Sequence, residues 1–359
     1  MAANCKVVGL DPGFGALKLG LPDGQAVSVP NVVGVGSVRD DALNPIMGAR
    51  RRRRLPRPRT VVVDGATYLV GERVSDHTNA VLERQDMARF AGGPDMDALL
   101  LAAVHALLGP GEHTLRVVVG LPVQVLSNQA AARRLVRAMQ QWMHGVHVGV
   151  VDGEEVRVVV CGAVAQPQPL GAFWGWGFNE KGRWIRDQAD LKARIGVADI
   201  GFNTLDLYVI QGLQHVPVHS RGHNLGTRQA AETLIDLLES TFGITPRLDE
   251  ADAILRDGEA ALAVLGLDEE DVAPLRKQAL ASAAAEVINY ILRVWKNPRQ
   301  FRHVLLTGGG ALLLGDSIRK NHEEFEIVDN APVANAVGLA RIGTRINKWP
   351  RVDVPECEG

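Results

Sequence analysis

Cysteine is scarce in this sequence: among 359 residues there are three, Cys5, Cys161 and Cys357, spread over the whole length. No CxxC pair occurs, so the pattern fits neither a structural zinc site nor a disulfide framework. Cys161 ends an apolar run and is predicted to be a small buried side chain. We therefore expect a reducing compartment and a core that is stable without cross-links.

Long apolar runs are missing as well. No stretch approaches the roughly 18 apolar residues of a membrane-spanning helix. The beginning, MAANCKVVGLD, leads directly into a strand-like run and holds neither a signal-peptide core nor an amphipathic helix. The sequence thus predicts a cytoplasmic protein with no membrane attachment.

Neither sign of charge dominates. Lysine and arginine number 39, aspartate and glutamate 41, and the net charge is −2. Such a chain lacks a global basic footprint, so no direct nucleic-acid binding is expected. The one dense basic segment places seven arginines between Arg50 and Arg59. It is interpreted as a solvated loop, with a subunit, partner or DNA contact as the alternatives.

Short apolar runs alternate with segments of helical period, which favours an α/β fold, and the length suggests about two domains. Buried strands are predicted at 6–10, 115–119, 156–160, 196–200 and 303–307, with hairpin partners at 16–20 and 204–210. Helices are predicted over 95–108, from a Ser127 cap to Met143, from a Thr227 cap onward, and over 269–296.

An internal repeat is the strongest organisational signal. The nonapeptide DPGFGALKL at 11–19 returns as DIGFNTLDL at 199–207. The identical pairs are Asp11 and Asp199, Gly13 and Gly201, Phe14 and Phe202, Leu17 and Leu205, and Leu19 and Leu207. Each copy follows a buried strand and precedes a second one, which predicts a duplicated strand–turn–strand unit, one in each domain.

The repeated unit suits phosphate binding. A turn with exposed backbone N–H groups forms an anion-binding concavity, and glycine lets a phosphate approach closely. An Asp at the strand end can hold hydrated Mg²⁺. Two such turns facing each other would hold a nucleotide triphosphate, with Thr204 adding a hydroxyl and Lys18 a charge. The alternative is a pair of ordinary tight turns, which the matched repeat disfavours.

A third glycine cluster, Gly308 to Gly310, lies between a buried strand and an apolar helix in HVLLTGGGALLLG. Neither GxxxxGK[ST] nor GxGxxG occurs, so the two commonest nucleotide-binding motifs do not explain these glycines.

Together these motifs resemble the actin-like ATPase superfamily, which also contains sugar kinases and the large heat-shock chaperones. DPGFGALKL is similar to its first phosphate loop, DIGFNTLDL to its second and LLTGGGALLL to its adenosine loop. The segments at 161–173 and 332–343 resemble its two connecting segments. The ParM-type actins of plasmid segregation resemble the chain most, including the phrase VVGLPV at 118–123.

The resemblance implies an actin-like fold of two related domains, each a mixed sheet flanked by helices, with the nucleotide in the cleft. The implied parts are domain I at 1–172 with an outer subdomain at about 25–93, a Trp-rich connector at 173–192, domain II at 193–331, a returning helix at 332–348 and a tail at 349–359. Trp174, Trp176 and Trp184 mark that connector, which is interpreted as an insertion.

The resemblance also implies roles for single residues. Asp11 and Asp199 would hold Mg²⁺ through water, and Gln166, with Gln168 as the second candidate, would orient the attacking water. The implied nucleotide contacts are Gly13, Phe14, Gly15, Ala16, Lys18, Gly201, Phe202, Asn203, Thr204, Gly222, Asn224, Leu225, Gly226, Gly308, Gly309, Gly310 and Ala311. Ala16 departs from the family, which usually has a hydroxyl or amide side chain there.

The implied activity is hydrolysis of ATP, with GTP as an alternative, coupled to assembly into a homopolymer filament and to a DNA-bound adaptor protein. One rival is a small-molecule kinase of the same superfamily, but such enzymes need a carboxylate base where this chain has Gln166 and Gln168. Another is a chaperone-like protein or a non-polymerising nucleotide-binding scaffold, and a third is a binding module that has lost hydrolysis, with which Ala16 is consistent.

Three histidines, His215, His219 and His223, fall four residues apart, the spacing of metal ligands on a helix. Pro217 and the alternating valines favour a strand instead, so no metal site is predicted there.

Overall fold

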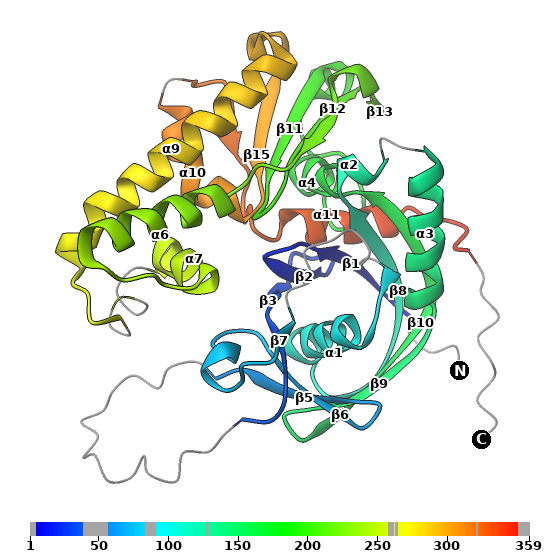
Figure 1. Ribbon diagram of the computed structural model, residues 1–359. Helices are drawn as coiled ribbons and strands as arrows, with labels where there is room; N and C mark the ends of the chain where they lie inside the picture. The colour runs from blue at the N-terminus through cyan, green and yellow to red at the C-terminus, as the bar shows by residue number, and fades with distance from the viewer. Residues whose placement is uncertain are drawn as a thin grey trace.

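The computed structural model describes residues 5–38, 57–82, 91–126, 129–257, 262, 265–320 and 322–350. Two lobes, each built around one β-sheet, stack on either side of a pair of helices (Figure 1). The first lobe holds a ten-stranded sheet and the second lobe a six-stranded one. This confirms the predicted mixed α/β fold with two related sheets.

The sheet of the first lobe has the order β3-β2-β1-β8-β10-β9-β5-β6-β4-β7. Its strands are β1 (Lys6–Pro12), β2 (Ala16–Gly20), β3 (Ala26–Pro30), β4 (Val33–Val35), β5 (Arg59–Val63), β6 (Ala66–Val70), β7 (Val81–Leu82), β8 (Gly111–Leu121), β9 (Gly145–Val151) and β10 (Glu154–Pro167). Its helical elements are η1 (Val74–Asp76), α1 (Pro94–Leu108), α2 (Val123–Leu126) and α3 (Gln129–Met143). α1 begins at a proline, which suits a first turn, and covers one face of the sheet.

The sheet of the second lobe has the order β13-β12-β11-β15-β16, with β14 also paired to β12. Its strands are β11 (Arg194–Ile200), β12 (Leu205–Gln211), β13 (Gln214–His215), β14 (Arg221–His223), β15 (His303–Thr307) and β16 (Phe325–Ile327). Its helical elements are α5 (Gln188–Lys192), η3 (Pro217–His219), α6 (Arg228–Phe242), α7 (Leu248–Asp257), α9 (Glu269–Trp295), η4 (Pro298–Gln300) and α10 (Gly309–Arg319).

The two sheets share a pairing scheme. β1 pairs antiparallel with β2 and parallel with β8, which pairs parallel with β10. Likewise β11 pairs antiparallel with β12 and parallel with β15, which pairs parallel with β16. The repeated nonapeptides form the β1–β2 and β11–β12 hairpins, so the predicted duplicated unit is present in both lobes.

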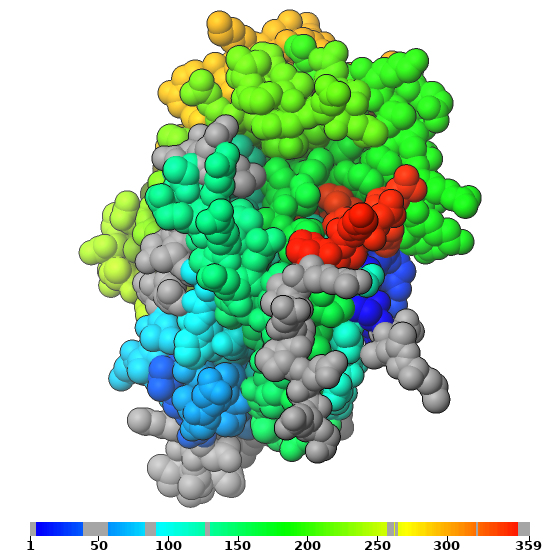
Figure 2. Space-filling model, turned by 90° about the vertical axis from the view of Figure 1, so that its right-hand side faces the viewer, coloured from blue at the N-terminus to red at the C-terminus, as the bar shows by residue number. Residues whose placement is uncertain are grey.

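Helices α4 (Gln168–Gly177) and α11 (Ala334–Gly343) lie between the sheets and cross each other closely. A Cβ on Gly338 would lie 1.7 Å from the carbonyl oxygen of Gly171. The Arg341 guanidinium donates to the carbonyl oxygens of Gly175 and Phe178, each at 2.7 Å, and so ties the end of α4 to α11. In Figure 2 the red C-terminal part of the described chain lies between the green second lobe and the blue start of the chain.

Most predicted elements are confirmed. All seven predicted strands overlap strands of the structure, and the helices predicted over 95–108, up to Met143, after Thr227 and over 269–296 correspond to α1, α3, α6 and α9. Thr227 precedes α6, but its side chain makes no capping hydrogen bond. Ser127, most of the arginine-rich segment and residues 351–359, including Cys357, lie outside the described residues.

The tryptophan-rich segment between the lobes packs against the second lobe. Trp174 and Trp176 lie on α4 between the lobes, and Trp176 belongs to the core of the second lobe with the neighbouring Phe173. Trp184 packs against the ring of Phe178, with centroids 5.1 Å apart. The aromatic side chains therefore hold a connection between the sheets.

Cys161 is half-buried at a β-bulge, and its Sγ lies 3.0 Å from that of Cys5. Burial and the neighbouring thiol raise the pKa of Cys5 to about 12. The two cysteines, far apart in the sequence, thus meet as free thiols, which the spacing could not indicate.

The three histidines lie against separate aromatic rings. His215 stacks on Tyr208 and His223 on Tyr290, with ring centroids 4.4 Å apart in each pair. His219 meets the edge of Phe301. Within the described ranges no helix is both long and apolar enough to span a membrane.

Candidate functional site

The two repeated turns meet where the lobes face each other. The first turn closes with the Gly13 N–H donating to the Asp11 carbonyl at 3.0 Å, and the second with the Gly201 N–H donating to the Thr204 carbonyl at 2.8 Å. A Cβ on Gly15 would lie 3.0 Å from the Cβ of Phe202, so the turns are in contact. The Asn31 side-chain amide donates to the Phe14 carbonyl at 2.9 Å and fixes the first turn.

Buried polar side chains gather directly behind the turns. Asp11 is 2% exposed and Asp199 is 7% exposed. Asp11 accepts from the Gln168 amide at 2.7 Å and pairs with the Lys18 ammonium at 3.3 Å. Asp199 accepts from the Asn335 amide at 2.6 Å. Lys18, expected beside a phosphate, is held close to the turn by this ion pair.

A third carboxylate, Asp206, joins this group and was not predicted. It lies opposite Asp199 in the β11–β12 register and is 1% exposed. The equivalent register partner of Asp11 is Lys18. The repeat could have drawn attention to Asp206, because the first copy has Lys18 at the position where the second copy has Asp206.

Asp206 also links the lobes. Its Oδ1 accepts the Val123 N–H at 3.0 Å, at the start of α2 in the first lobe. Its Oδ2 is buried and has no hydrogen-bond partner in the described part of the chain. An unpartnered buried carboxylate oxygen is costly and marks a place where a polar group or cation would be stabilising.

The electrostatics follow from this crowding. Burial and the charge of Asp11 raise the pKa of Asp199 to about 6. Burial and the charge of Asp199 raise the pKa of Asp206 well above its ordinary value. Excess negative charge in a buried place favours a bound cation.

The donor set matches hydrated Mg²⁺, which prefers a few carboxylates and several waters. Among the described residues no group of three or more His, Cys, Asp or Glu side chains is arranged to hold a metal ion directly. Asp11, Asp199 and Asp206 supply buried carboxylate oxygens, the type of group that contacts hydrated Mg²⁺.

The two glutamine candidates differ in their surroundings. Gln166 is half-buried near the end of β10, opposite Gly120. Gln168 is 5% exposed at the start of α4 and contacts Asp11. The structure therefore places Gln168 inside the carboxylate cluster and Gln166 two residues before it.

The triple glycine packs against the second hairpin. Gly308 has φ +84°, and a Cβ there would lie 2.4 Å from Asp199 Oδ1. A Cβ on Gly310 would lie 2.4 Å from the Ile200 side chain, while the Arg256 guanidinium lies over Gly309. Ala311 is fully buried behind them. The third predicted loop thus borders the carboxylates.

The segment before α6 meets the site only in part. A Cβ on Gly226 would lie 2.3 Å from the Phe202 carbonyl oxygen, so this glycine seats α6 on the second turn. Leu225 is buried and Asn224 is exposed. Gly222 instead packs against Gln124 of the first lobe, where a Cβ would lie 2.6 Å from its backbone nitrogen.

The remaining predicted residues lie on the turns. Ala16 begins β2, Thr204 is 8% exposed, and Asn203 lies between Thr204 and Phe202 at the tip. With a methyl group only, Ala16 offers no side-chain hydrogen bond to a ligand.

A cavity of about 360 Å³ adjoins the turns. Phe14, Gly15 and Phe202 line it from the turns, and Ser75, Arg247 and Asp249 line it from η1 and the start of α7. The site is therefore a cleft with walls from both lobes.

Two family models match the chain. The description "Actin like proteins N terminal domain" matches residues 9–171, and "Archaeal actin homologue MreB-like, C-terminal" matches residues 197–320. Together they include both repeated nonapeptides and the whole glycine cluster. No curated protein matches the sequence.

Several solved structures share the fold. The psk41 ParM protein in its apo form is 18% identical with a TM-score of 0.65, over 95% of this chain and 97% of that one. An archaeal actin homologue in complex with ADP is 20% identical with a TM-score of 0.68, over 95% of this chain and 100% of that one. A 15-stranded ParM filament from Clostridium botulinum is 17% identical with a TM-score of 0.69, over 96% of this chain and 100% of that one.

Proposed function

Because family models of actin-like proteins match both lobes of the chain, we propose that it is a member of the actin-like ATPase superfamily and a filament-forming ATPase that hydrolyses ATP with Mg²⁺ between its two lobes. A cytoskeletal or plasmid-segregation role, with a DNA-bound adaptor as partner, belongs to the same proposal. Relatives of this fold include an ADP complex and a ParM filament, which support the nucleotide and the self-assembly.

One observation carries the proposal: two homologous turns from opposite lobes meet over a buried group of carboxylates. Either turn alone would be ordinary. Two turns in contact, with Asp11 and Asp199 behind them, provide backbone N–H groups for phosphate oxygens and acidic groups for a hydrated cation.

The residues of the chain would divide the work of hydrolysis. Backbone N–H groups of the Gly13–Ala16 and Gly201–Thr204 turns would bind phosphate oxygens and orient the terminal phosphate. Asp11 and Asp199 would hold Mg²⁺ through water, and the cation when bound neutralises charge that develops on the phosphates. Gln166 or Gln168 would hold the attacking water, a task of positioning that needs no strong base.

The two lobes give nucleotide a way to control assembly. A triphosphate touching both turns binds the closed arrangement better than an open one, so it shifts the population toward closure. Hydrolysis removes that preference. If the filament contact requires the closed arrangement, assembly follows the nucleotide state.

The test combines sedimentation with phosphate release. The purified protein is centrifuged with ATP, ADP or no nucleotide, and released phosphate is measured in parallel. We expect pelleting with ATP and phosphate release that depends on Mg²⁺. Phosphate release without pelleting would support a non-polymerising ATPase, and ADP formation only with an added sugar would support a small-molecule kinase. Either result would contradict the filament proposal.

The glutamines provide a matched pair of variants. Gln166→Ala and Gln168→Ala are measured for nucleotide affinity and for phosphate release. The variant that loses the water-orienting side chain should release phosphate at least about 10²-fold more slowly than the parent protein, because hydrolysis depends on positioning and electrostatic stabilisation. Its affinity for ATP should change little. Parental rates in both variants would contradict the mechanism.

A further inference from the structure

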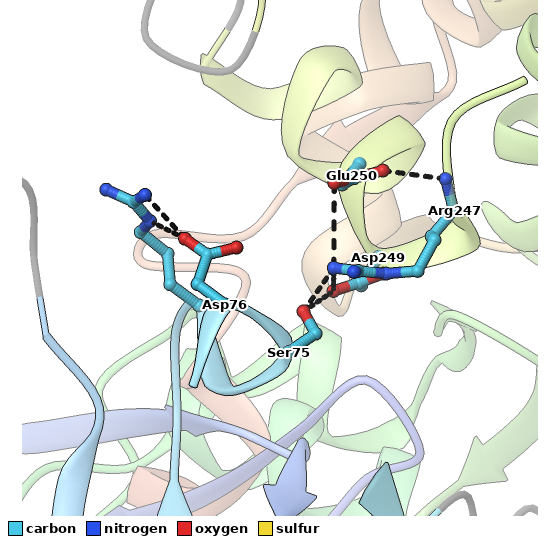
Figure 3. A network of polar contacts seen from close by, with 6 residues as sticks. Ser75, Asp76, Arg247, Asp249 and Glu250 are labelled. Carbon is cyan, nitrogen blue, oxygen red and sulfur yellow. Dashed lines mark hydrogen bonds and ion pairs between the residues drawn. The ribbon is translucent and has the colours of Figure 1, made fainter. Parts of the chain in front are cut away.

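A small polar network joins the two lobes (Figure 3). Ser75 comes from η1 in the first lobe, and Arg247 and Asp249 come from the start of α7 in the second lobe. The Ser75 hydroxyl donates to Asp249 Oδ2 at 3.1 Å, and the Arg247 guanidinium donates to the Ser75 oxygen. These partners are 172 and 174 residues apart in the sequence.

The second-lobe side of this network is held in place before it reaches Ser75. The Arg247 guanidinium donates to both carboxylate oxygens of Asp249, at 3.1 and 3.0 Å. The backbone N–H of Arg247 donates to Glu250 Oε2 at 2.8 Å, which fixes the start of α7. Although burial alone would raise it, the bond and charge of Arg247 hold the pKa of Asp249 below its ordinary value.

The first-lobe side is also rigid. Val74 is fully buried, and a Cβ on Gly34 would lie 2.5 Å from its side chain, so η1 is packed tightly onto β4. Arg73, in the left-handed region at φ 57°, pairs with Asp76 on the same turn at 2.6 Å. Ser75 is therefore presented to the other lobe by a fixed turn.

The network and the turns border the same cavity. Phe14, Gly15 and Phe202 of the turns line it together with Ser75, Arg247 and Asp249 of the network. A ligand that extends from the turns into this cavity would therefore lie beside a bridge between the lobes. Movement of η1 away from α7 must break that bridge before the cleft can open.

We propose that the contact of Ser75 with Arg247 and Asp249 is a latch across the cleft that sets how fast a nucleotide leaves the turns. The inference rests on the proposed nucleotide site and adds its control. The hydrogen bonds involve charged partners but are partly exposed, so we expect them to slow opening by about three- to tenfold.

The test measures dissociation of a fluorescent ADP analogue from the full chain after mixing with excess unlabelled ADP. Ser75→Ala should release it three to ten times faster than the parent protein. Ser75→Thr keeps the hydroxyl and should stay near the parental rate. Glu232→Gln, which removes an exposed ion pair with Arg228 inside α6, is the control and should not change the rate.

A double-mutant cycle decides whether the residues act together. Ser75→Ala and Asp249→Ala should each speed release, and the double variant should be little faster than either single one, because both remove the same bridge. Additive effects, or an unchanged rate in Ser75→Ala, would overturn the latch. A parent protein that binds no nucleotide would contradict the proposed function itself. A parent protein that binds nucleotide, with an unchanged release rate in Ser75→Ala, would contradict the latch alone.

A cross-link gives the opposite perturbation. In a Ser75→Cys, Asp249→Cys double variant, oxidised glutathione would convert two thiols to a disulfide and itself be reduced to two glutathione thiols. Bound nucleotide should then be released more slowly than from the reduced form, and a reductant should restore release. Equal rates for the two forms, with the cross-link verified by mass, would contradict the latch. The parent protein treated in the same way controls for its native cysteines.

Discussion

Single buried charges define the site at the residue scale. Asp199 lies beside Asp206 and close to Asp11, all with little exposure to solvent. Burial, and next the charge of Asp11, disfavour the ionised carboxylate, which is why the pKa of Asp199 rises to about 6. The unliganded protein thus stores an electrostatic cost that a cation would relieve.

This cost predicts how stability depends on pH. The pKa of Asp199 is near 6 in the folded chain against an ordinary 3.8, so the folded state binds its proton more tightly. The resulting stabilisation is complete below about pH 4 and is lost as pH rises through 6. In nucleotide-free parent protein, the unfolding free energy should therefore fall between pH 5 and 7.5. In the Asp199→Asn variant this fall should be smaller, by on the order of 2 kcal/mol.

Chemical denaturation at several pH values measures this. Glu155→Gln, at an exposed carboxylate on β10, is the control and should leave the slope as in the parent protein. The same pH dependence in Asp199→Asn and the parent would show that Asp199 is not the group responsible.

Single site residues could be predicted where the internal repeat marks them. Asp11 and Asp199, with their glycine turns, were predicted because the nonapeptide at 11–19 recurs at 199–207. Asp206 was missed because it replaces a lysine in the other copy. The partnership of Ser75 with Arg247 could not be predicted, because only the folded chain brings such distant segments together.

The crossing of α4 and α11 is the key feature at the element scale. α4 has the sequence QPLGAFWGWG, whose glycines disfavour a helix and concealed it from sequence analysis. The structure supplies the reason: Gly171 and Gly175 let the backbone of α11 approach closely. Tertiary packing therefore overrides propensity here, whereas α1, α6 and α9 have ordinary helical patterns.

A methyl group at this crossing should be costly. In Gly338→Ala the new Cβ would lie 1.7 Å from the Gly171 carbonyl oxygen, so the helices must separate. We expect a loss of at least about 3 kcal/mol of unfolding free energy, at the upper end of overpacking effects. Gly175→Ala, whose Cβ would lie 3.0 Å from the Ala334 carbonyl oxygen, should cost less.

Urea denaturation of both variants tests this ranking. A Gly338→Ala protein as stable as Gly175→Ala would mean that the two helices are not in close contact in solution.

On the scale of the whole molecule, two homologous lobes are joined by the crossing of α4 and α11 and by the Ser75 bridge. The duplicated hairpin, one in each lobe, could be predicted from the repeat and the strand pattern. The strands β4 to β7 and β9 were not predicted; β4 and β7, with three and two residues, are too short to carry a periodic signal. The cleft follows from placing the two hairpins face to face.

The most direct test of the central claim is a crystal structure of the protein with Mg²⁺ and a non-hydrolysable ATP analogue. The account predicts the phosphates between the Gly13–Ala16 and Gly201–Thr204 turns, with the cation reached through water from Asp11 and Asp199. An analogue bound elsewhere, or bound to one lobe without contact to the other, would contradict it.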